Sequence, residues 1–167
     1  AEWGFGLSSR RVTVSTVGLV PVLERLVRET SVSVAISLSG TTDEQRARLM
    51  PVNKRYPLAT LMGACRNLPI PQRRRITFEY VMLAGVNDTL DDAKRLVRLL
   101  HGIRSKVNLI PFNPFPGSDF QCSSPQAIKQ FQQHLLSCGI GAPIRRSRGR
   151  DIDAACGQLA LTGERRA

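Results

Sequence analysis

Short runs of β-branched and apolar residues alternate along the chain with longer stretches in which apolar residues recur every three or four positions. The runs predict β-strands at 11–15, 32–38, 76–82 and 106–110. The longer stretches predict α-helices at 19–28, 58–67 and 90–100, the last of them preceded by a capping sequence at 87–89. Because strands and helices alternate, the pattern predicts an α/β fold with a parallel sheet, either doubly wound or curled toward a barrel.

The pattern changes after residue 110. Three prolines between 111 and 117 exclude a regular element there and predict a stiff loop. A further helix is predicted at 125–136, and a final short strand is predicted around Ile144. Four strands are too few to close a barrel, so the sheet is expected to be open.

Small polar residues stand at the carboxyl ends of the predicted strands. Ser15 ends the first strand, Ser37 and Ser39 end the second, and Asn113 lies in the loop after the fourth. Ligands of parallel α/β sheets bind at this edge, because the loops that follow the strands all emerge there. Neutral hydroxyl and amide groups suit a ligand with ribose hydroxyls and an amino-acid head. The same residue types are ordinary in turns, so a purely structural role is the alternative for each of them.

A cysteine near the end of the chain has the surroundings of a nucleophile. Cys156 follows Asp151 and Asp153, either of which could cap a helix, and several arginines precede it at 145–150. A helix start and neighbouring cations both favour the thiolate over the thiol. The alternative is a packed thiol with no chemical role.

The other cysteines and the two histidines give weaker signals. Cys65 and Cys138 lie in amphipathic helical stretches and are predicted to be small buried side chains, whereas Cys122 is predicted to be exposed in a polar loop. His101 and His134 have no partner at catalytic or metal-binding spacing, so both are predicted on helix surfaces. These residues predict no metal site.

The net charge of +11, from 24 basic and 13 acidic residues, favours a polyanionic partner. Arginines dominate and cluster at 73–75 and 145–150. Guanidinium groups match phosphate oxygens, which favours nucleic acid over a small acidic substrate, although arginine clusters are also common on solvated surfaces. Aromatic residues make up only 5% of the chain and are not interleaved with the basic clusters, which argues against a stacking platform for single strands.

The length of 167 residues and the 42% apolar content predict one domain, and cysteine usage and hydropathy indicate a cytoplasmic protein. The four widely spaced cysteines are typical of reduced thiols rather than of a disulfide scaffold. No apolar run approaches the ~20 residues that a membrane span requires, so no membrane partner is predicted. The chain opens at Ala1 without an initiator methionine, which favours a truncated start.

Six segments, in this order, resemble the dual-specificity RNA methyltransferases that modify carbon 2 of an adenine in 23S ribosomal RNA and in certain transfer RNAs. The segments are RVTVSTVG at 11–18, AISL at 35–38, MPVNKRYP at 50–57, EYVML at 79–83, NLIPFNPFPG at 108–117 and DIDAACGQL at 151–159. The resemblance covers essentially the whole chain. It implies a partial radical-SAM (βα)6 barrel of the TIM type, within one domain spanning 1–167. The chain would supply about the last four βα units at 1–145 and a C-terminal segment at 146–167.

The resemblance also implies roles for individual residues. The implied contacts to S-adenosylmethionine are Ser15, Ser37, Leu38, Ser39 and Asn113. Cys156 is the implied methyl-carrying cysteine, which accepts a methyl group from one S-adenosylmethionine. A second molecule, cleaved by a [4Fe-4S] cluster with electrons from a donor such as flavodoxin, then yields the radical that activates this methyl group. Because carbon 2 of adenine is not nucleophilic, polar methyl transfer fails there and the cofactors carry the difficult step.

The chain departs from the family pattern in two ways. Family members usually carry His or Asn at the position of Ser39. The three cluster cysteines, spaced Cys-x3-Cys-x2-Cys, do not occur in the chain, nor do the second catalytic cysteine, the acidic base and the Gly-Glu cofactor contact. Without cluster ligands there is no electron source, so the chain alone is expected to be inactive and to yield no 5′-deoxyadenosine. An unpaired sheet edge is also expected to make it aggregation-prone or loosely dimeric.

Two other functions remain as alternatives. One is the sister family that methylates carbon 8 of the same adenine, although the loop at 112–117 looks more like the carbon-2 group. The other is a non-catalytic basic module that only binds RNA. Locating the methyl group on the base distinguishes a carbon-2 from a carbon-8 methyltransferase. Searching the genomic sequence upstream of the Ala1 codon for the cluster motif distinguishes an enzyme from a non-catalytic RNA-binding module.

Overall fold

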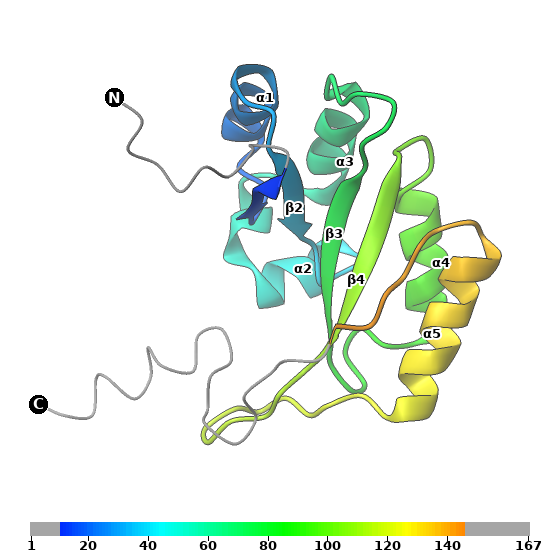
Figure 1. Cartoon of the computed structure of the whole chain (residues 1–167). Coiled ribbons are helices and arrows are strands. Elements are labelled where there is room, and N and C mark those ends of the chain that lie inside the picture. Colours follow the sequence, from blue (N-terminus) through cyan, green and yellow to red (C-terminus); the bar gives the residue numbers. More distant parts are fainter. Residues whose placement is uncertain (1–10, 146–167) are drawn as a thin grey trace, which may run out of the picture.

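The computed structural model describes residues 11–145, which form one four-stranded sheet and its covering helices (Figure 1). The strands are β1 (Thr13–Thr16), β2 (Ser33–Ser37), β3 (Ile76–Met82) and β4 (Ser105–Pro111). The helices are α1 (Val20–Glu29), α2 (Asp43–Leu49), the 3-10 helix η2 (Pro51–Lys54), α3 (Leu58–Asn67), α4 (Leu90–Leu99) and α5 (Pro125–Ser137). The strands are parallel in the order β1-β2-β3-β4, which confirms the predicted α/β fold with a parallel sheet.

The sequence pattern located every strand and four of the helices to within two residues. It missed α2 and η2, which fill the connection between β2 and α3. The α2 segment, DEQRARL, has no apolar stripe, so periodicity gives no signal there. The helix forms because Thr42 caps its first turn by accepting a hydrogen bond from the Gln45 amide, and because Arg46 is buried beneath it.

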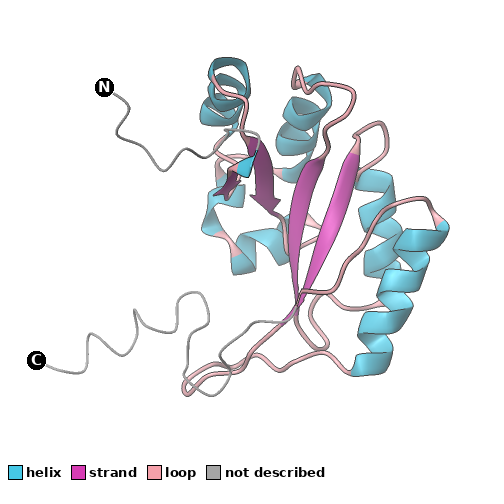
Figure 2. Ribbon diagram, in the orientation of Figure 1, coloured by secondary structure: helices cyan, strands magenta, loops and turns pink. Residues whose placement is uncertain are grey.

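Alternate residues of each strand point to opposite faces of the sheet, and the two faces differ in chemistry. One face is apolar and packs against the helices as a second layer (Figure 2). Its strand residues, buried in the core, are Val34, Ile36, Ile76, Phe78, Tyr80, Met82, Val107 and Leu109. They meet buried residues of α1, α3, α4 and α5, such as Leu23, Leu61, Leu96 and Phe131. This packing supplies the core and leaves the other sheet face for other uses.

The sheet is open, as expected, and its two edges differ. The segment 141–145 runs parallel to β4, where the amides of Val107 and Leu109 donate to the carbonyls of Gly141 and Pro143 at 2.8 and 2.9 Å. The predicted final strand near Ile144 is therefore present only as isolated bridges, because Pro143 lacks the amide hydrogen that a regular ladder needs. Within 11–145 no strand pairs with the outer side of β1.

None of the helices in the described part of the chain is long and apolar enough to cross a membrane.

Candidate ligand site on the polar face of the sheet

The sheet face opposite the core carries polar side chains, and we call it the polar face. Its members are Thr13, Ser15, Ser33, Ser37, Thr77, Glu79, Lys106 and Asn108, interrupted by Ala35, Val81 and Ile110. Ser37, Glu79 and Asn108 are in register on three neighbouring strands and so form a polar row across the sheet. This row begins at the carboxyl end of β2, at the edge where ligands of parallel sheets bind, and crosses the middle of β3 and β4.

A hydrogen bond crosses this face from β1 to β3. The Ser15 hydroxyl donates to Glu79 Oε2 at 3.0 Å, over the intervening strand β2. Two strand spacings are about 9–10 Å, so the long Glu79 side chain must extend across β2 to reach Ser15. Ala35, in register with Ser15, has a side chain small enough to leave the path open. The polar face thus brings together residues 64 positions apart in the sequence.

Arg46 of α2 ties the carboxyl ends of β1 and β2 together. One terminal nitrogen, Nη2, donates to the carbonyls of Val17 and Ser37 at 2.8 and 3.2 Å, and Nη1 donates to Asn53 at 3.0 Å. The side chain is fully buried, and this burial lowers the pKa of its guanidinium. Gly40 packs against Arg46 so closely that a Cβ there would lie 2.8 Å from the Arg46 amide nitrogen. The loops that follow β1 and β2 are thus held in one arrangement.

Ser39 is built into the loop after β2. Its backbone has φ 48°, its hydroxyl accepts a hydrogen bond from the Val81 amide at 3.1 Å, and its carbonyl accepts from Asn87 at 2.9 Å. Asn87 is completely buried and also bonds the backbone of Val81 and Leu83. Leu38 is likewise buried in the core, so only its backbone is available to a ligand.

The loop after β4 is shaped by aromatic packing. Phe112 lies 6.1 Å from Phe115 and 6.2 Å from Phe120, measured between ring centroids, and Arg48 of α2 lies over the Phe120 ring. Asn113 is half-buried in this loop and its side chain makes no hydrogen bond with any other residue of 11–145. Its amide therefore remains available for the predicted ligand contact.

Behind these loops, Asp92 of α4 is a buried anchor. Burial alone would raise the pKa of Asp92, but hydrogen bonds from Thr89, Gln45, Thr41 and Arg95 outweigh it and lower the pKa below the ordinary value. The bond from Thr41 fastens the loop after β2 to α4, and the bond from Gln45 fastens α2 to it. Asp43 plays a similar part, since the Leu58 amide and Asn53 bond its carboxylate and lower its pKa.

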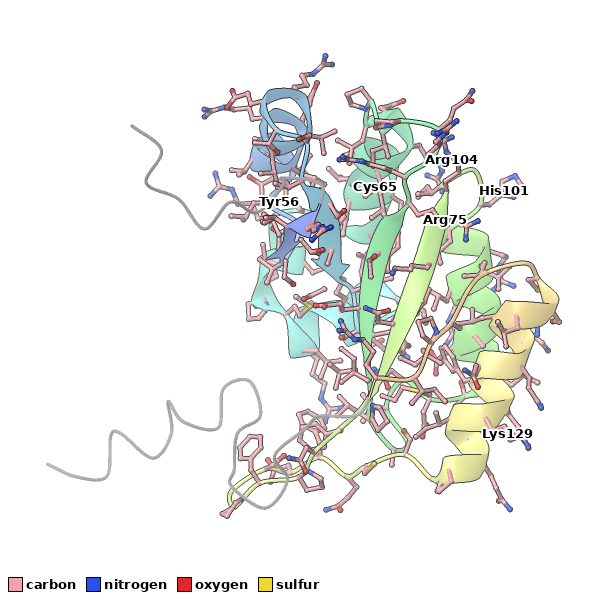
Figure 3. The ribbon with its side chains drawn as sticks, in the orientation of Figure 1. Tyr56, Cys65, Arg75, His101, Arg104 and Lys129 are labelled. Atoms are coloured by element: carbon pink, nitrogen blue, oxygen red, sulfur yellow. The ribbon has the colours of Figure 1, made fainter. Side chains whose placement is uncertain are left out.

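The cysteines do not all lie where the sequence suggested. Cys65 of α3 is buried, as predicted, and burial raises the pKa of its thiol to about 12 (Figure 3). Cys138 is exposed, so the prediction that it is buried was wrong: α5 ends at Ser137 and the residue after it turns to solvent. Cys122 is half-buried rather than fully exposed. Cys156 lies outside the described residues, and its predicted role stays a prediction.

No group of three or more His, Cys, Asp and Glu residues within 11–145 is arranged to hold a metal ion. The residues of the polar row that sequence reasoning missed are Glu79 and Asn108. Glu79 offered one signal, because a single acidic residue interrupts the otherwise apolar strand ITFEYVM.

The basic residues predicted at 73–75 lie at the opposite end of the sheet, before β3. Arg74 donates to the carbonyls of Ser31 and Val32, whereas Arg73 and Arg75 are exposed. Figure 3 shows Arg75 near His101 and Arg104, and these three residues line part of a hollow of about 380 Å³. This basic end is separate from the polar row, so the structure does not combine the two features in one site.

Comparison with known proteins places the chain. No protein-family model matches it. It is 59% identical over 156 residues to the dual-specificity RNA methyltransferase RlmN of Geobacter sulfurreducens, and 56% identical over 163 residues to that of Anaeromyxobacter dehalogenans. The chain belongs to the RlmN dual-specificity RNA methyltransferase family. The alignments cover 93% and 98% of this chain but 43% and 44% of those RlmN proteins, so the chain spans under half of their length.

Solved structures agree with this RlmN membership. A radical SAM methyltransferase from Sphaerobacter thermophilus matches with a TM-score of 0.89 and 48% identity, over 95% of this chain and 47% of that one. A domain of the pyruvate-formate lyase-activating enzyme from Bacteroides vulgatus matches with a TM-score of 0.62 over 80% of each chain. At 16% identity, this second match supports the fold alone.

Proposed function

We propose that this chain forms the S-adenosylmethionine-binding part of a radical-SAM methyltransferase that modifies carbon 2 of an adenine in 23S ribosomal RNA and in transfer RNA. The observation that carries the proposal is the polar face, on which Ser15 and Ser37 lie at strand ends beside Glu79 in a chain homologous to RlmN. In this proposal the four strands are the last four of a six-stranded partial barrel, supplied by about 1–145. Residues 146–167 form the C-terminal segment that carries Cys156.

The residues of the polar face fit S-adenosylmethionine. When bound, this cofactor supplies an activated methyl group and, after reductive cleavage, an adenosyl radical. Ser15 and the backbone of 37–39 would hold its ribose and amino-acid groups by neutral hydrogen bonds, and Asn113 would reach it from the loop after β4. Arg46 and Asn87 would keep these groups in place, because they fix the backbone of the loops that carry Ser37 and Ser39.

An iron-sulfur cluster does not fit the described residues. Cys65 is buried on α3, and residues 11–145 hold no set of thiols or histidines arranged around one point. Its ligands would have to come from other residues of the protein. Cys156 is proposed as the methyl acceptor because the segment DIDAACGQL surrounds it with the sequence of the family's methyl-carrying cysteine.

The activity test uses the complete gene product that carries this sequence, prepared without oxygen, and a 23S ribosomal RNA fragment. We expect mass spectrometry to find one methyl group on an adenine, at carbon 2, and to find none with the Cys156→Ala variant. A methyl group at carbon 8, or no transfer by the unaltered protein, contradicts the proposal. Cys138→Ala, which removes an exposed thiol outside the site, is the matched control and should methylate normally.

We propose that the enzyme is cytoplasmic and receives electrons from a donor such as flavodoxin. The proposal that it binds RNA rests on its positive charge. Arg73 and Arg75 are exposed, and neither forms an ion pair with any other residue of 11–145. Replacing both with Gln should weaken RNA binding and flatten its dependence on salt. Arg25 and Arg28 of α1, which pair with Glu29 and Glu24, are the matched control, since replacing them removes the same charge. Equal losses from both pairs would show that only net charge matters.

A further inference from the structure

We propose that Glu79 is a positioning residue that fixes the Ser15 hydroxyl as a hydrogen-bond acceptor facing the bound cofactor. This inference rests on the proposed function, because it assumes that the polar face binds S-adenosylmethionine. It concerns a residue of β3 to which the sequence assigned no role. The observation behind it is the 3.0 Å hydrogen bond from Ser15 Oγ to Glu79 Oε2 across the polar face.

The direction of this hydrogen bond follows from its chemistry. A serine hydroxyl has one hydrogen to donate and two lone pairs with which to accept, whereas an ionised carboxylate can only accept. Once Ser15 donates to Glu79, its oxygen has only lone pairs left for another partner. The ligand group opposite Ser15 must then be a donor. In S-adenosylmethionine the donors that suit a strand-end hydroxyl are a ribose hydroxyl and the ammonium of the amino-acid head.

The place of Glu79 in the fold argues against a merely solvated charge. It lies in the middle of β3, half-buried on the polar face, whereas acidic residues are depleted in strand interiors. A carboxylate that loses water is costly unless it is hydrogen-bonded, so its position requires a compensating use. Ser37 and Asn108 are in register beside it, and Thr77, Val81 and Lys106 lie on the same face.

Glu79 also keeps one acceptor open. None of the ion pairs in the described part of the chain includes Glu79, and no residue of 11–145 bonds its second oxygen, Oε1. Within 11–145, the Ser15 hydroxyl is thus the one side chain that bonds the Glu79 carboxylate. Ser15 is itself exposed on β1, so its remaining lone pairs are accessible to a ligand on the polar face.

A double-mutant cycle on the complete gene product tests this. The readout is the affinity for S-adenosylhomocysteine, measured by isothermal titration calorimetry. Ser15→Ala and Glu79→Ala should each weaken binding by about 3–10-fold, the value of one hydrogen bond. If Glu79 acts through Ser15, the double variant should be no weaker than the weaker single variant. Multiplied losses in the double variant would overturn the proposal, because they would show two independent contacts.

Glu79→Gln sharpens the test, because its side-chain carbonyl can still accept from Ser15 while the charge is gone. We expect this variant to bind within about threefold of the unaltered protein, whereas a direct ionic contact to the ligand would make it as weak as Glu79→Ala. The latter result overturns the proposal. Repeating the cycle with 5′-methylthioadenosine, which has the ribose but no ammonium, identifies the donor. If the donor is a ribose hydroxyl, the coupling between the two substitutions persists. If the donor is the ammonium, the coupling vanishes.

The controls separate this inference from the proposed function and from misfolding. Glu24→Ala removes an exposed carboxylate from α1 and should leave the affinity unchanged. Equal melting temperatures establish that each variant is folded. If the unaltered protein does not bind S-adenosylhomocysteine, the proposed function itself fails. If it binds and the cycle is additive, only the role of Glu79 fails.

Discussion

The two faces of the sheet are built from the same strands, but one stabilises the fold and the other is proposed to bind the ligand. In β3, Ile76, Phe78 and Tyr80 are buried against the helices, while Thr77 and Glu79, which alternate with them, belong to the polar face. The apolar face is stabilised by burial in a close-packed core. The energy of this packing depends on the volume of the side chains and not on the direction of individual bonds. The polar face depends on directed hydrogen bonds. Substitutions on the two faces should therefore separate stability from ligand binding.

The largest expected effect is on stability, from the apolar face. Phe78→Ala should lower the free energy of unfolding by about 3–5 kcal/mol, because it removes a fully buried ring and leaves a cavity. Glu79→Ala, one residue along the same strand, should lower it by at most about 1 kcal/mol. Urea unfolding of both variants measures the difference. Similar losses of unfolding free energy in the two variants would contradict the claim that the apolar face, and not the polar face, stabilises the fold.

The rim at the carboxyl ends of β1 and β2, where Arg46 bonds Val17 and Ser37, should affect both stability and ligand binding. Arg46→Met keeps an unbranched side chain but leaves the carbonyls of Val17 and Ser37 without their donor, which should cost about 2–3 kcal/mol. It should also weaken S-adenosylhomocysteine binding. Arg48→Met on the same helix, where the arginine lies over the Phe120 ring, should cost under about 1 kcal/mol. Arg46→Met binding as well as the unaltered protein would show that the rim does not shape the site.

The Asp92 anchor should make stability depend on pH. Because its pKa is lower in the folded chain than in the unfolded one, its contribution is complete above the unfolded value of about 4 and is lost as the pH falls below it. Unfolding midpoints measured between pH 6 and 3 should therefore fall less steeply for Asp92→Asn. Asp91→Asn, an exposed carboxylate on the same helix, controls for the change in charge. Parallel curves for Asp92→Asn and the unaltered chain would refute the anchor.

The smallest change to the molecule is a chemical label. Iodoacetamide at pH 8 should modify exposed Cys138 on the order of a hundredfold faster than Cys65, because the Cys65 thiol is buried and its pKa is raised to about 12. Peptide mass mapping over time gives both rates. In urea the two rates should converge. Equal rates in the native chain would mean that the apolar face is open to solvent.

The strands, four of the helices and the strand-end residues Ser15 and Ser37 could be predicted, because periodicity and the parallel-sheet rule are local signals. The error at Cys138 arose because the helical spacing of Ile128, Phe131 and Leu135 continues to it, although the helix has ended. Arg46, Asn87 and the Ser15–Glu79 bond could not be predicted, because each depends on contacts between distant segments.

The measurement that tests the central claim most directly is a crystal structure of the complete gene product with S-adenosylmethionine. We expect the cofactor over the polar face at the carboxyl ends of β1 and β2, with a donor group within hydrogen-bond distance of Ser15 Oγ. A cofactor seated instead at the opposite end of the sheet, in the hollow that contains Arg75 and Arg104, would contradict it.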